Sequence, residues 1–581
     1  MEKRTYNIQE NVKIVIATLK AYNIRHIVVS PGGTNIPISQ AVQDDPFFHC
    51  YSVVDERSAM YFAIGLYLQT GEYIATSCTS AQATRNYLPG LTEAFYKHVP
   101  ILAITTSKLK RYAYQEYMQA PDQVSMPRDT VKCSFDLPPV TDANTRVQCL
   151  QDTKKAILEL SHHGKGPVQL NIRITDVLNK EFAKESLPAI KVTKRYSLWD
   201  SWDDVSLTDK KVLLVVGEHL PFNEEEKRAI EDFCNSHNVA VYVNHLSNYY
   251  GNYSINANLL VSSLSASSIE SLFAPDVVLT IGGQTGDYPL FGLLNHPLKQ
   301  AEHWRIAMDG DYIDTYGKLT KIFECPANDF FYRMKGDCES THSYYDIWCS
   351  ANEEMEHGME LPFSNIYVAQ QLAPLIPSGS YMNFAILNSL RAWSYFDLHP
   401  SIKCFSNVAA FGIDGCTSTL IGESMNTDAK CFMVTGDLAF FYDMNALGIR
   451  HIKNNIRILL INNGGGAEFK IMTKGWENKP DTEPYISAMG HNGSAKGWAE
   501  NCGFLYLKAS SKAELNTHIE EFLGDVNAPV LFEIFTKPDS EVEAMQLIVS
   551  TNRVLTSSDK LKSIIKGILV NGITKVIKGI V

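Results

Sequence analysis

The sequence predicts an α/β protein built from mostly parallel sheets that are flanked by helices. Short apolar runs rich in β-branched residues, such as residues 431–435 and 456–461, alternate with helical stretches along the chain. Runs of this kind are typical of parallel strands buried on both faces. The chain has 581 residues, of which 45% are hydrophobic, and this is enough for three such domains.

In the amino-terminal third, a predicted strand at residues 51–54 ends in Asp55 and Glu56. Glu56 then precedes an almost wholly apolar helix at residues 59–66, so its carboxylate is predicted to lie in a buried environment. A buried glutamate holds its proton tightly and needs a specific partner. The alternative is that Glu56 pairs with Arg57 or caps the helix.

Two further turns in this region carry residues that suit a cofactor. The strand at residues 24–29 ends at Pro31 and Gly32, and the strand at residues 73–77 leads into Thr79 and Ser80. Hydroxyl groups at a strand-to-helix turn are good hydrogen-bond partners for a phosphate or another part of a cofactor, although they are also ordinary helix caps.

The central segment, from about residue 191 to 334, again contains runs typical of parallel strands. Its Gly282-Gly283 pair is too weak a signal for a nucleotide site, so a structural role is favoured. The acidic residues Asp309, Asp311 and Asp314 lack the spacing of a calcium loop and are interpreted as a solvated loop.

The most informative part of the sequence is a βαβ unit in the carboxyl-terminal third. Asp437 and Asn463 each follow the carboxyl end of a predicted strand. A right-handed crossover brings such ends together at one edge of a parallel sheet. Mg²⁺ takes few protein oxygens, so Asp437, the Asn463 side chain and a backbone carbonyl near Gly465 would suffice, with a diphosphate and water supplying the rest.

The same unit offers groups for the diphosphate. Gly464, Gly465 and Gly466 let the backbone come close to phosphate oxygens, and a helix that opens near Phe440 adds N–H donors at its positive end. The alternative is an ordinary strand end and an ordinary turn in an α/β protein that binds no ligand there.

Composition narrows the class of protein. The twelve cysteines form no Cys-x-x-Cys pair, and the chain has no secretory signal and no apolar run long enough to span a bilayer. Reduced thiols in a cytoplasmic protein are therefore expected. The formal charge of −12 argues against a general nucleic-acid binder.

Several motifs occur in a fixed order along the chain. They are Ser30-Pro31-Gly32, Asp55-Glu56-Arg57-Ser58, Cys78-Thr79-Ser80, Leu88-Pro89-Gly90, Glu93-Ala94-Phe95-Tyr96, Gln119 with Asp122-Gln123, Ser406-Asn407, Gly412-Ile413-Asp414-Gly415, Gly436-Asp437-Leu438 and Asn462-Asn463-Gly464-Gly465. Together they resemble the thiamine-diphosphate enzymes of the SEPHCHC synthase type from the menaquinone pathway. The resemblance extends from about residue 8 to about residue 545.

The resemblance implies three α/β domains of the thiamine-diphosphate enzyme type. We expect a pyrimidine-binding domain at residues 1–185, a Rossmann-like structural domain at 190–350 and a diphosphate- and Mg²⁺-binding domain at 355–550. The first and third are expected to have similar topology. The resemblance also implies a homo-oligomer, a dimer or tetramer, with each active site at a subunit interface.

The resemblance further assigns roles to residues. Glu56 would activate the aminopyrimidine ring of the cofactor, and Gln119 with Ser389 would face the substrate. The residues expected to bind thiamine diphosphate are Pro31, Gly32, Thr79, Ser80, Asn86, Ser406, Asn407, Ile413, Asp414, Gly436, Leu438 and Gly464, and those expected to bind Mg²⁺ are Asp437, Asn463 and Gly465.

The substrate end departs from the family pattern. Members of the family place arginines at positions that here are Thr34, Trp393 and Val408, and in a loop that here contains Lys108, Lys110 and Arg111. Those arginines hold carboxylated substrates by bidentate contacts that a neutral residue cannot make.

We therefore expect a 2-oxo acid decarboxylase and carboligase with a different acceptor, and poor turnover of 2-oxoglutarate with isochorismate. One alternative is SEPHCHC synthase itself with relocated contacts. Another is a catalytically silent scaffold that binds thiamine diphosphate, which the retention of Glu56, Asp437 and Asn463 disfavours.

The tail at residues 555–581 lies outside the family pattern. After Asp559 it contains five lysines and no acidic residue, while its isoleucines recur at helical spacing. This pattern is typical of a basic amphipathic segment. The tail is expected either to contact a membrane surface or to dock on the enzyme body or a partner.

Overall fold

The structure is a computed structural model that describes residues 4–175, 182–296, 301–472 and 483–556. The carboxyl-terminal tail therefore lies almost entirely outside the described residues. Contacts divide the chain into two compact units, residues 1–201 with 308–324, and residues 202–307 with 325–581.

The first unit is built on a six-stranded sheet, in the order β3-β2-β4-β5-β7-β6, whose strands are all parallel. Its strands are β2 (His26–Val29), β3 (His49–Ser52), β4 (Ile74–Cys78), β5 (Ile101–Ser107), β6 (Ser134–Leu137) and β7 (Val168–Arg173). The helices are α1 (Glu10–Ala21), α2 (Ile36–Gln43), α3 (Glu56–Thr70), α4 (Gln82–Asn86), α5 (Leu88–Tyr96) and α6 (Ala143–Glu159).

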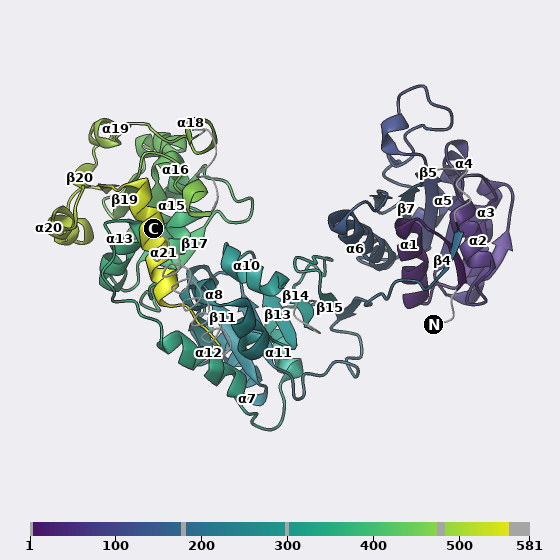
Figure 1. Ribbon diagram of the computed structural model, residues 1–581, viewed down its shortest axis with the longest axis horizontal. Helices are drawn as coiled ribbons and strands as arrows, with labels where there is room; N and C mark the ends of the chain where they lie inside the picture. The colour runs from purple at the N-terminus through teal and green to yellow at the C-terminus, as the bar shows by residue number, and fades with distance from the viewer. Residues whose placement is uncertain (1–3, 176–181, 297–300, 473–482, 557–581) are drawn as a thin grey trace, which may run out of the picture. The chain divides into compact units, whose positions relative to one another are not determined.

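Both faces of this sheet are covered (Figure 1). One apolar cluster joins the sheet to α1, α2 and α6, and a second joins it to α3 and α5. Burial on both faces explains why strands such as β4 and β5 are apolar without alternation. Two strand pairs complete the unit: antiparallel β1 (Arg4–Asn7) with β8 (Phe182–Glu185), and parallel β9 (Lys194–Ser197) with β15 (Leu319–Glu324).

The second unit contains two parallel sheets. The central one has the order β12-β11-β10-β13-β14, with strands β10 (Val212–Val216), β11 (Val239–Val243), β12 (Ser254–Asn256), β13 (Val277–Ile281) and β14 (Glu302–Ile306). Its helices are α7 (Glu224–Ser236), α8 (Asn258–Ser263), α9 (Ala266–Ser268), α10 (Tyr288–Asn295), α11 (Ala327–Met334) and α12 (Ser343–Glu353).

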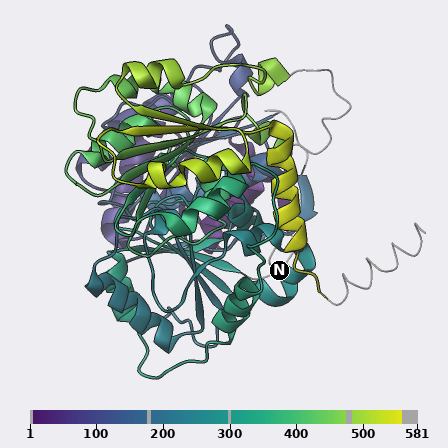
Figure 2. The same cartoon turned by 90° about the vertical axis from the view of Figure 1, so that its left-hand side faces the viewer.

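The other sheet of this unit has the order β17-β16-β18-β19-β21-β20. Its strands are β16 (Tyr381–Phe384), β17 (Lys403–Ser406), β18 (Cys431–Gly436), β19 (Ile456–Asn462), β20 (Leu505–Ala509) and β21 (Val530–Phe535). The helices are α13 (Asn365–Leu372), α14 (Asn388–Trp393), α15 (Cys416–Ser424), α16 (Asp437–Tyr442), α17 (Glu468–Met472), α18 (Glu483–Ile486), α19 (Lys496–Asn501), α20 (Lys512–Leu523) and α21 (Pro538–Thr551). Helix α21, yellow in Figures 1 and 2, packs against α8, α13 and α17.

The predicted α/β fold with mostly parallel sheets is confirmed. Numbered within its own sheet, the first and the last six-stranded sheet both have the strand order 2-1-3-4-6-5, so the expected similarity of the first and third domains is also confirmed. The domain boundaries at 1–185, 190–350 and 355–550 stay a prediction, because the two compact units divide the chain differently.

The strand order of each sheet fixes where a ligand can bind. In open parallel sheets ligands bind outside the carboxyl ends of the strands, at the point where the strand order reverses. These points lie between β2 and β4, between β10 and β13, and between β16 and β18. In the central sheet, residues near this edge are hydrogen-bonded to the segment around residues 404–409. Asn248 donates to the Cys404 carbonyl and accepts from the Cys404 N–H (2.8 Å each), and Gln284 donates to the Ala409 carbonyl (2.9 Å).

All twelve cysteines are free. Among the described residues, no helix combines the length and the apolar character needed to cross a bilayer.

Candidate active site

The carboxylate of Asp437 lies at the centre of the carboxyl-terminal switch point. Asp437 is the first residue of α16 and is only 2% exposed. Its Oδ2 accepts hydrogen bonds from the backbone N–H groups of Asn463 (3.1 Å), Gly464 (2.8 Å) and Gly465 (3.0 Å), and its Oδ1 accepts one from Leu438 (2.6 Å). The structure thus brings together the two strand ends that the sequence placed at one edge.

The side chain of Asn463, the residue whose backbone N–H bonds to Asp437, carries a second oxygen. Its Oδ1 is buried and has no hydrogen-bond partner among the described residues. A buried acceptor without a donor is costly, and a cation is a partner that satisfies it. Burial raises the pKa of the Asp437 carboxyl, while His491 and the loop N–H groups act in the opposite direction. This set of oxygens fits a hard cation such as Mg²⁺.

The glycines of the loop are required for a reason that the sequence did not predict. Gly464 and Gly465 have φ values of +84° and +150°, which favour glycine. A Cβ atom on Gly465 would also lie 2.7 Å from Met489 Cα and 2.9 Å from the Ala488 carbonyl oxygen. A distant segment of the chain therefore packs directly against this loop, and the loop has no room for a side chain there.

Glu533 was also missed by the sequence analysis. It is fully buried on β21 and accepts hydrogen bonds from Asn462 Nδ2 (2.8 Å), Ser494 Oγ (2.7 Å) and Tyr506 Oη (2.7 Å), as well as from the Ala495 backbone N–H. Through these bonds it fixes the end of β19 to the start of α19. A lone glutamate in an apolar strand was the only signal for it in the sequence.

The other carboxyl-terminal residues of the predicted site lie around the same sheet edge. Ser406 is buried with its Oγ unpartnered among the described residues, and Asn407 Nδ2 donates to Thr419 (3.3 Å). Ile413 packs against the apolar clusters on both faces of the sheet. Ser389, at the start of α14, is buried. Of the remaining residues, Gly436 and Leu438 are half-buried and Asp414 is exposed.

In the first unit, the turns after β2 and β4 pack tightly together. A Cβ atom on Gly32 would collide with the side chain of Thr79, so this close approach needs glycine. Ser80 is buried, and its Oγ has no partner among the described residues. Gln123 accepts a hydrogen bond from the Ala81 backbone N–H (2.9 Å) and donates to the Thr106 carbonyl (3.0 Å), which anchors this turn. Pro31 is exposed.

The predicted burial of Glu56 is wrong for this chain by itself. Glu56 is half-buried and is the first residue of α3, after the N-cap Asp55. It lies in the first turn of the helix, one turn before Ala59 and Met60, where the buried residues of α3 begin. Its Oε2 accepts a hydrogen bond from Asn86 Nδ2 (3.0 Å), another predicted site residue.

Gln119, predicted to face the substrate, is exposed and has a φ of +55°. The charged groups of two basic residues in the same loop contact other residues of that loop. Lys108 Nζ donates to the Met118 carbonyl (2.6 Å) and lies 4.6 Å from the centre of the Tyr117 ring. Arg111 lies 4.8 Å from the centre of the Tyr112 ring.

The three positions without the family arginines are all buried. Thr34 Oγ1 contacts Thr79 Oγ1 (2.8 Å) and Thr106 Oγ1 (2.7 Å) and accepts the Ser80 backbone N–H (2.9 Å), a set that we name the threonine cluster. Trp393 is 1% exposed and Val408 is fully buried. The nearby Arg391 makes a bidentate ion pair with Glu468 (2.9 Å for both contacts).

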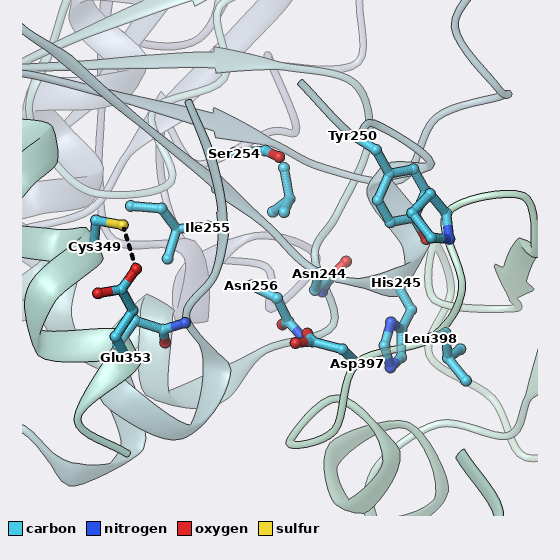
Figure 3. A pocket seen from close by; sticks show the side chains of 13 residues that line it. Asn244, His245, Tyr250, Ser254, Ile255, Asn256, Cys349, Glu353, Asp397 and Leu398 are labelled. Carbon is cyan, nitrogen blue, oxygen red and sulfur yellow. Dashed lines mark hydrogen bonds between the residues drawn. The ribbon is translucent and has the colours of Figure 1, made fainter. Parts of the chain in front are cut away.

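Two other places among the described residues do not have the groups that a nucleotide or a metal ion would need. A cavity of about 440 Å³ lies at the carboxyl ends of β11 and β12, where it is lined by His245, Asn256 and Asp397 among others and by no lysine or arginine (Figure 3). It offers no cation to a nucleotide phosphate.

In the first unit, His162, His163 and Glu324 have the spacing of metal ligands. Both ring nitrogens of His162 are already engaged, since Nδ1 contacts Glu159 (3.1 Å) and Nε2 contacts the Asp309 carbonyl (2.9 Å). His162 therefore has no free nitrogen for a metal.

Comparison with known proteins agrees with the chemistry of these sites. A family model described as the thiamine pyrophosphate enzyme, N-terminal TPP binding domain, matches residues 10–126. The chain is 32% identical over 559 residues to the 2-succinyl-5-enolpyruvyl-6-hydroxy-3-cyclohexene-1-carboxylate synthase of Bacteroides fragilis, covering 93% of this chain and 98% of that protein. Proteins of the same name from Bacteroides thetaiotaomicron and Flavobacterium johnsoniae are 31% identical over 563 residues (93% of this chain and 98% of that protein) and 28% identical over 548 residues (90% and 95%).

Proposed function

Since this chain belongs to the family of the 2-succinyl-5-enolpyruvyl-6-hydroxy-3-cyclohexene-1-carboxylate (SEPHCHC) synthases, we propose that it decarboxylates a 2-oxo acid and joins the remaining acyl unit to an acceptor. The relatives are named for the SEPHCHC product, and the resemblance to their family implies 2-oxoglutarate as donor and isochorismate as acceptor. The observation that carries the proposal is the pairing of buried Asp437 with the unpartnered Oδ1 of Asn463 at a glycine loop.

Each part of the site has a task in this reaction. Thiamine diphosphate, when bound, supplies the electron sink for loss of carbon dioxide and for transfer of the acyl unit. Asp437, Asn463 and the Gly465 carbonyl would hold Mg²⁺, and Glu56 would hold a proton at the aminopyrimidine ring. Ser389 and Gln119 would orient the substrate.

The other predicted residues would bind the cofactor from two directions. We assign the diphosphate and thiazolium side to Ser406, Asn407, Ile413, Asp414, Gly436, Leu438 and Gly464, and the aminopyrimidine side to Pro31, Gly32, Thr79, Ser80 and Asn86. The two groups of residues belong to different compact units. A homo-oligomer in which one copy supplies Glu56 and another supplies Asp437 would complete the site.

A second candidate is the same chemistry with a different acceptor. The observation that favours it is the burial of Thr34, Trp393 and Val408, which leaves no cation at the positions where the family holds carboxylated substrates. Arg391 does not replace those contacts as it stands, because Glu468 occupies its guanidinium group.

An assay of both half-reactions separates the two candidates. With Mg²⁺, thiamine diphosphate, 2-oxoglutarate and isochorismate, we expect release of carbon dioxide together with formation of the SEPHCHC product, detected by mass spectrometry. Each missing bidentate carboxylate contact ordinarily weakens binding by about 1.5 to 3 kcal/mol, so a high KM for isochorismate is expected.

Release of carbon dioxide from a 2-oxo acid without the SEPHCHC product would favour the second candidate. A panel of aldehydes and 2-oxo acids would then identify the acceptor. If no 2-oxo acid in the panel loses carbon dioxide, the proposed function is wrong in both forms.

For the tail, the sequence pattern supports contact with an anionic membrane surface. The full-length protein is expected to co-sediment with anionic vesicles in a salt-sensitive way, whereas a version ending at Ser558 stays in solution with unchanged activity. Equal sedimentation of both versions would exclude this role, and loss of activity on truncation would indicate docking on the enzyme body.

A further inference from the structure

The segment from Ser487 to Gly493 lies directly against the glycine loop of the candidate metal site. The Gly466 backbone N–H donates to the Ser487 carbonyl (2.6 Å), and the Gly490 N–H donates to the Gly464 carbonyl (3.0 Å). At its end the segment is tied to β19, because Asn462 Nδ2 donates to the Gly493 carbonyl (2.8 Å). The segment is thus held at both sides of the loop.

His491 points from this segment toward Asp437. Its Nε2 lies 3.2 Å from Asp437 Oδ2, and the imidazole side chain is 25% exposed. The ring also stands edge-on to Phe441, with 5.6 Å between ring centres. Phe441 belongs to α16, the helix that Asp437 begins, so the imidazole is placed against both the carboxylate and its helix.

The other ring nitrogen determines which tautomer is present. The Gly493 backbone N–H donates to His491 Nδ1 (3.1 Å), so the lone pair of Nδ1 is used as an acceptor. In the neutral imidazole the proton then resides on Nε2. Nε2 is buried and makes no aligned hydrogen bond among the described residues, and Asp437 Oδ2 is the acceptor that lies within reach.

The two oxygens of Asp437 are therefore unequal. Oδ2 is surrounded by the N–H groups of residues 463–465 and by His491, whereas within the described part of the chain Oδ1 accepts only the Leu438 N–H. We propose that His491 is a positioning residue that holds Oδ2 through its Nε2–H, so that Oδ1 and Asn463 Oδ1 are presented to the cation. This inference rests on the proposed function of Asp437 as a metal ligand.

The test measures cofactor binding and does not depend on turnover. Thiamine diphosphate is titrated by calorimetry into full-length protein at a series of Mg²⁺ concentrations, and the unfolding temperature is recorded without cofactor. Changes to groups that orient a metal ligand typically weaken metal affinity 10- to 100-fold. For His491→Leu we expect a loss of about 10-fold or more in the Mg²⁺-dependent affinity.

A conservative variant separates positioning from packing. His491→Gln keeps an N–H donor of similar reach and is expected to restore most of the affinity, while both variants keep the unfolding temperature of the cofactor-free protein. His518→Leu is a matched control, because His518 on α20 likewise faces a carboxylate (Glu521, 3.6 Å) and stands edge-on to a phenylalanine ring (Phe532, 5.8 Å between ring centres). It should bind the cofactor as the unchanged protein does.

Two results would overturn the inference. Unchanged affinity in His491→Leu would show that Asp437 needs no help from the imidazole, and equal losses in the Leu and Gln variants would show that the ring acts only by packing. If the proposed function itself is wrong, Asp437→Ala will also leave cofactor binding unchanged. If only the role of His491 is wrong, Asp437→Ala will still lose cofactor binding.

Discussion

Asp437→Ala is expected to abolish Mg²⁺-dependent binding of thiamine diphosphate and to lower turnover by about 100-fold or more. The substitution removes one of the few protein oxygens available to the cation, so the charge of the diphosphate is no longer balanced. It also leaves the N–H groups of residues 463–465 without their acceptor. Each buried N–H group left unsatisfied costs roughly 1–3 kcal/mol, so a lower unfolding temperature is expected as well.

Calorimetric titration with and without Mg²⁺ checks this result. Asp443→Ala is a suitable control, because Asp443 follows the same helix α16 and accepts hydrogen bonds from the backbone and side chain of Ser418 (2.7 Å each). That variant should lose stability and keep its cofactor affinity. Unchanged affinity in Asp437→Ala would show that the cation site is placed wrongly.

Glu56→Gln is expected to lower turnover by about 10² to 10⁴-fold while cofactor affinity and unfolding temperature stay close to those of the unchanged protein. The amide keeps the shape of the side chain and an acceptor oxygen for Asn86 Nδ2, but it cannot transfer a proton. The measurement is exchange of the thiazolium C2 proton of bound cofactor, followed by NMR. Glu72→Gln, at an exposed glutamate of the same unit, is the control. An unchanged rate of C2 proton exchange in Glu56→Gln would show that Glu56 does not transfer a proton to the cofactor.

Mixing the two inactive variants tests whether one active site draws on two copies. If Glu56 and Asp437 of one site come from different copies, a mixed dimer contains one site with both residues intact. With random pairing, mixed dimers make up half of the population and carry one intact site of two, so about a quarter of full activity should return. No recovery after confirmed subunit exchange would place both residues in the same copy.

The sequence predicted the parts of the site that depend on neighbouring parallel strands. Asp437 and Asn463 are far apart in the chain, yet strands β18 and β19 pair directly, so their carboxyl ends had to meet. The burial expected for Glu56 was wrong, because the apolar composition of α3 was extended to its first turn, whereas the buried residues of the helix begin at Ala59.

Other contacts could not be predicted because they depend on packing between distant segments. His491 and Asp437 are not on adjacent strands, and nothing in a Gly-His-Asn-Gly sequence indicates which surface it will cover. The role of the glycine loop shows the same limit. Its glycines suggested an approach to phosphate, while the structure shows that they also admit Met489 and Ala488.

The threonine cluster has a consequence for how this chain can change its substrate. An arginine at position 34 would have to leave a site that is 1% exposed and would remove the acceptor that Thr34 Oγ1 provides to the Ser80 N–H. The hydroxyl groups of Thr79 and Thr106 would lose their common partner in the same step. A single substitution to arginine at position 34 is therefore expected to destabilise this turn, and an arginine there would need accompanying changes at Thr79, Ser80 or Thr106. The packing at Thr34 thus makes the residue type at this position depend on three neighbouring residues, and not on substrate binding alone.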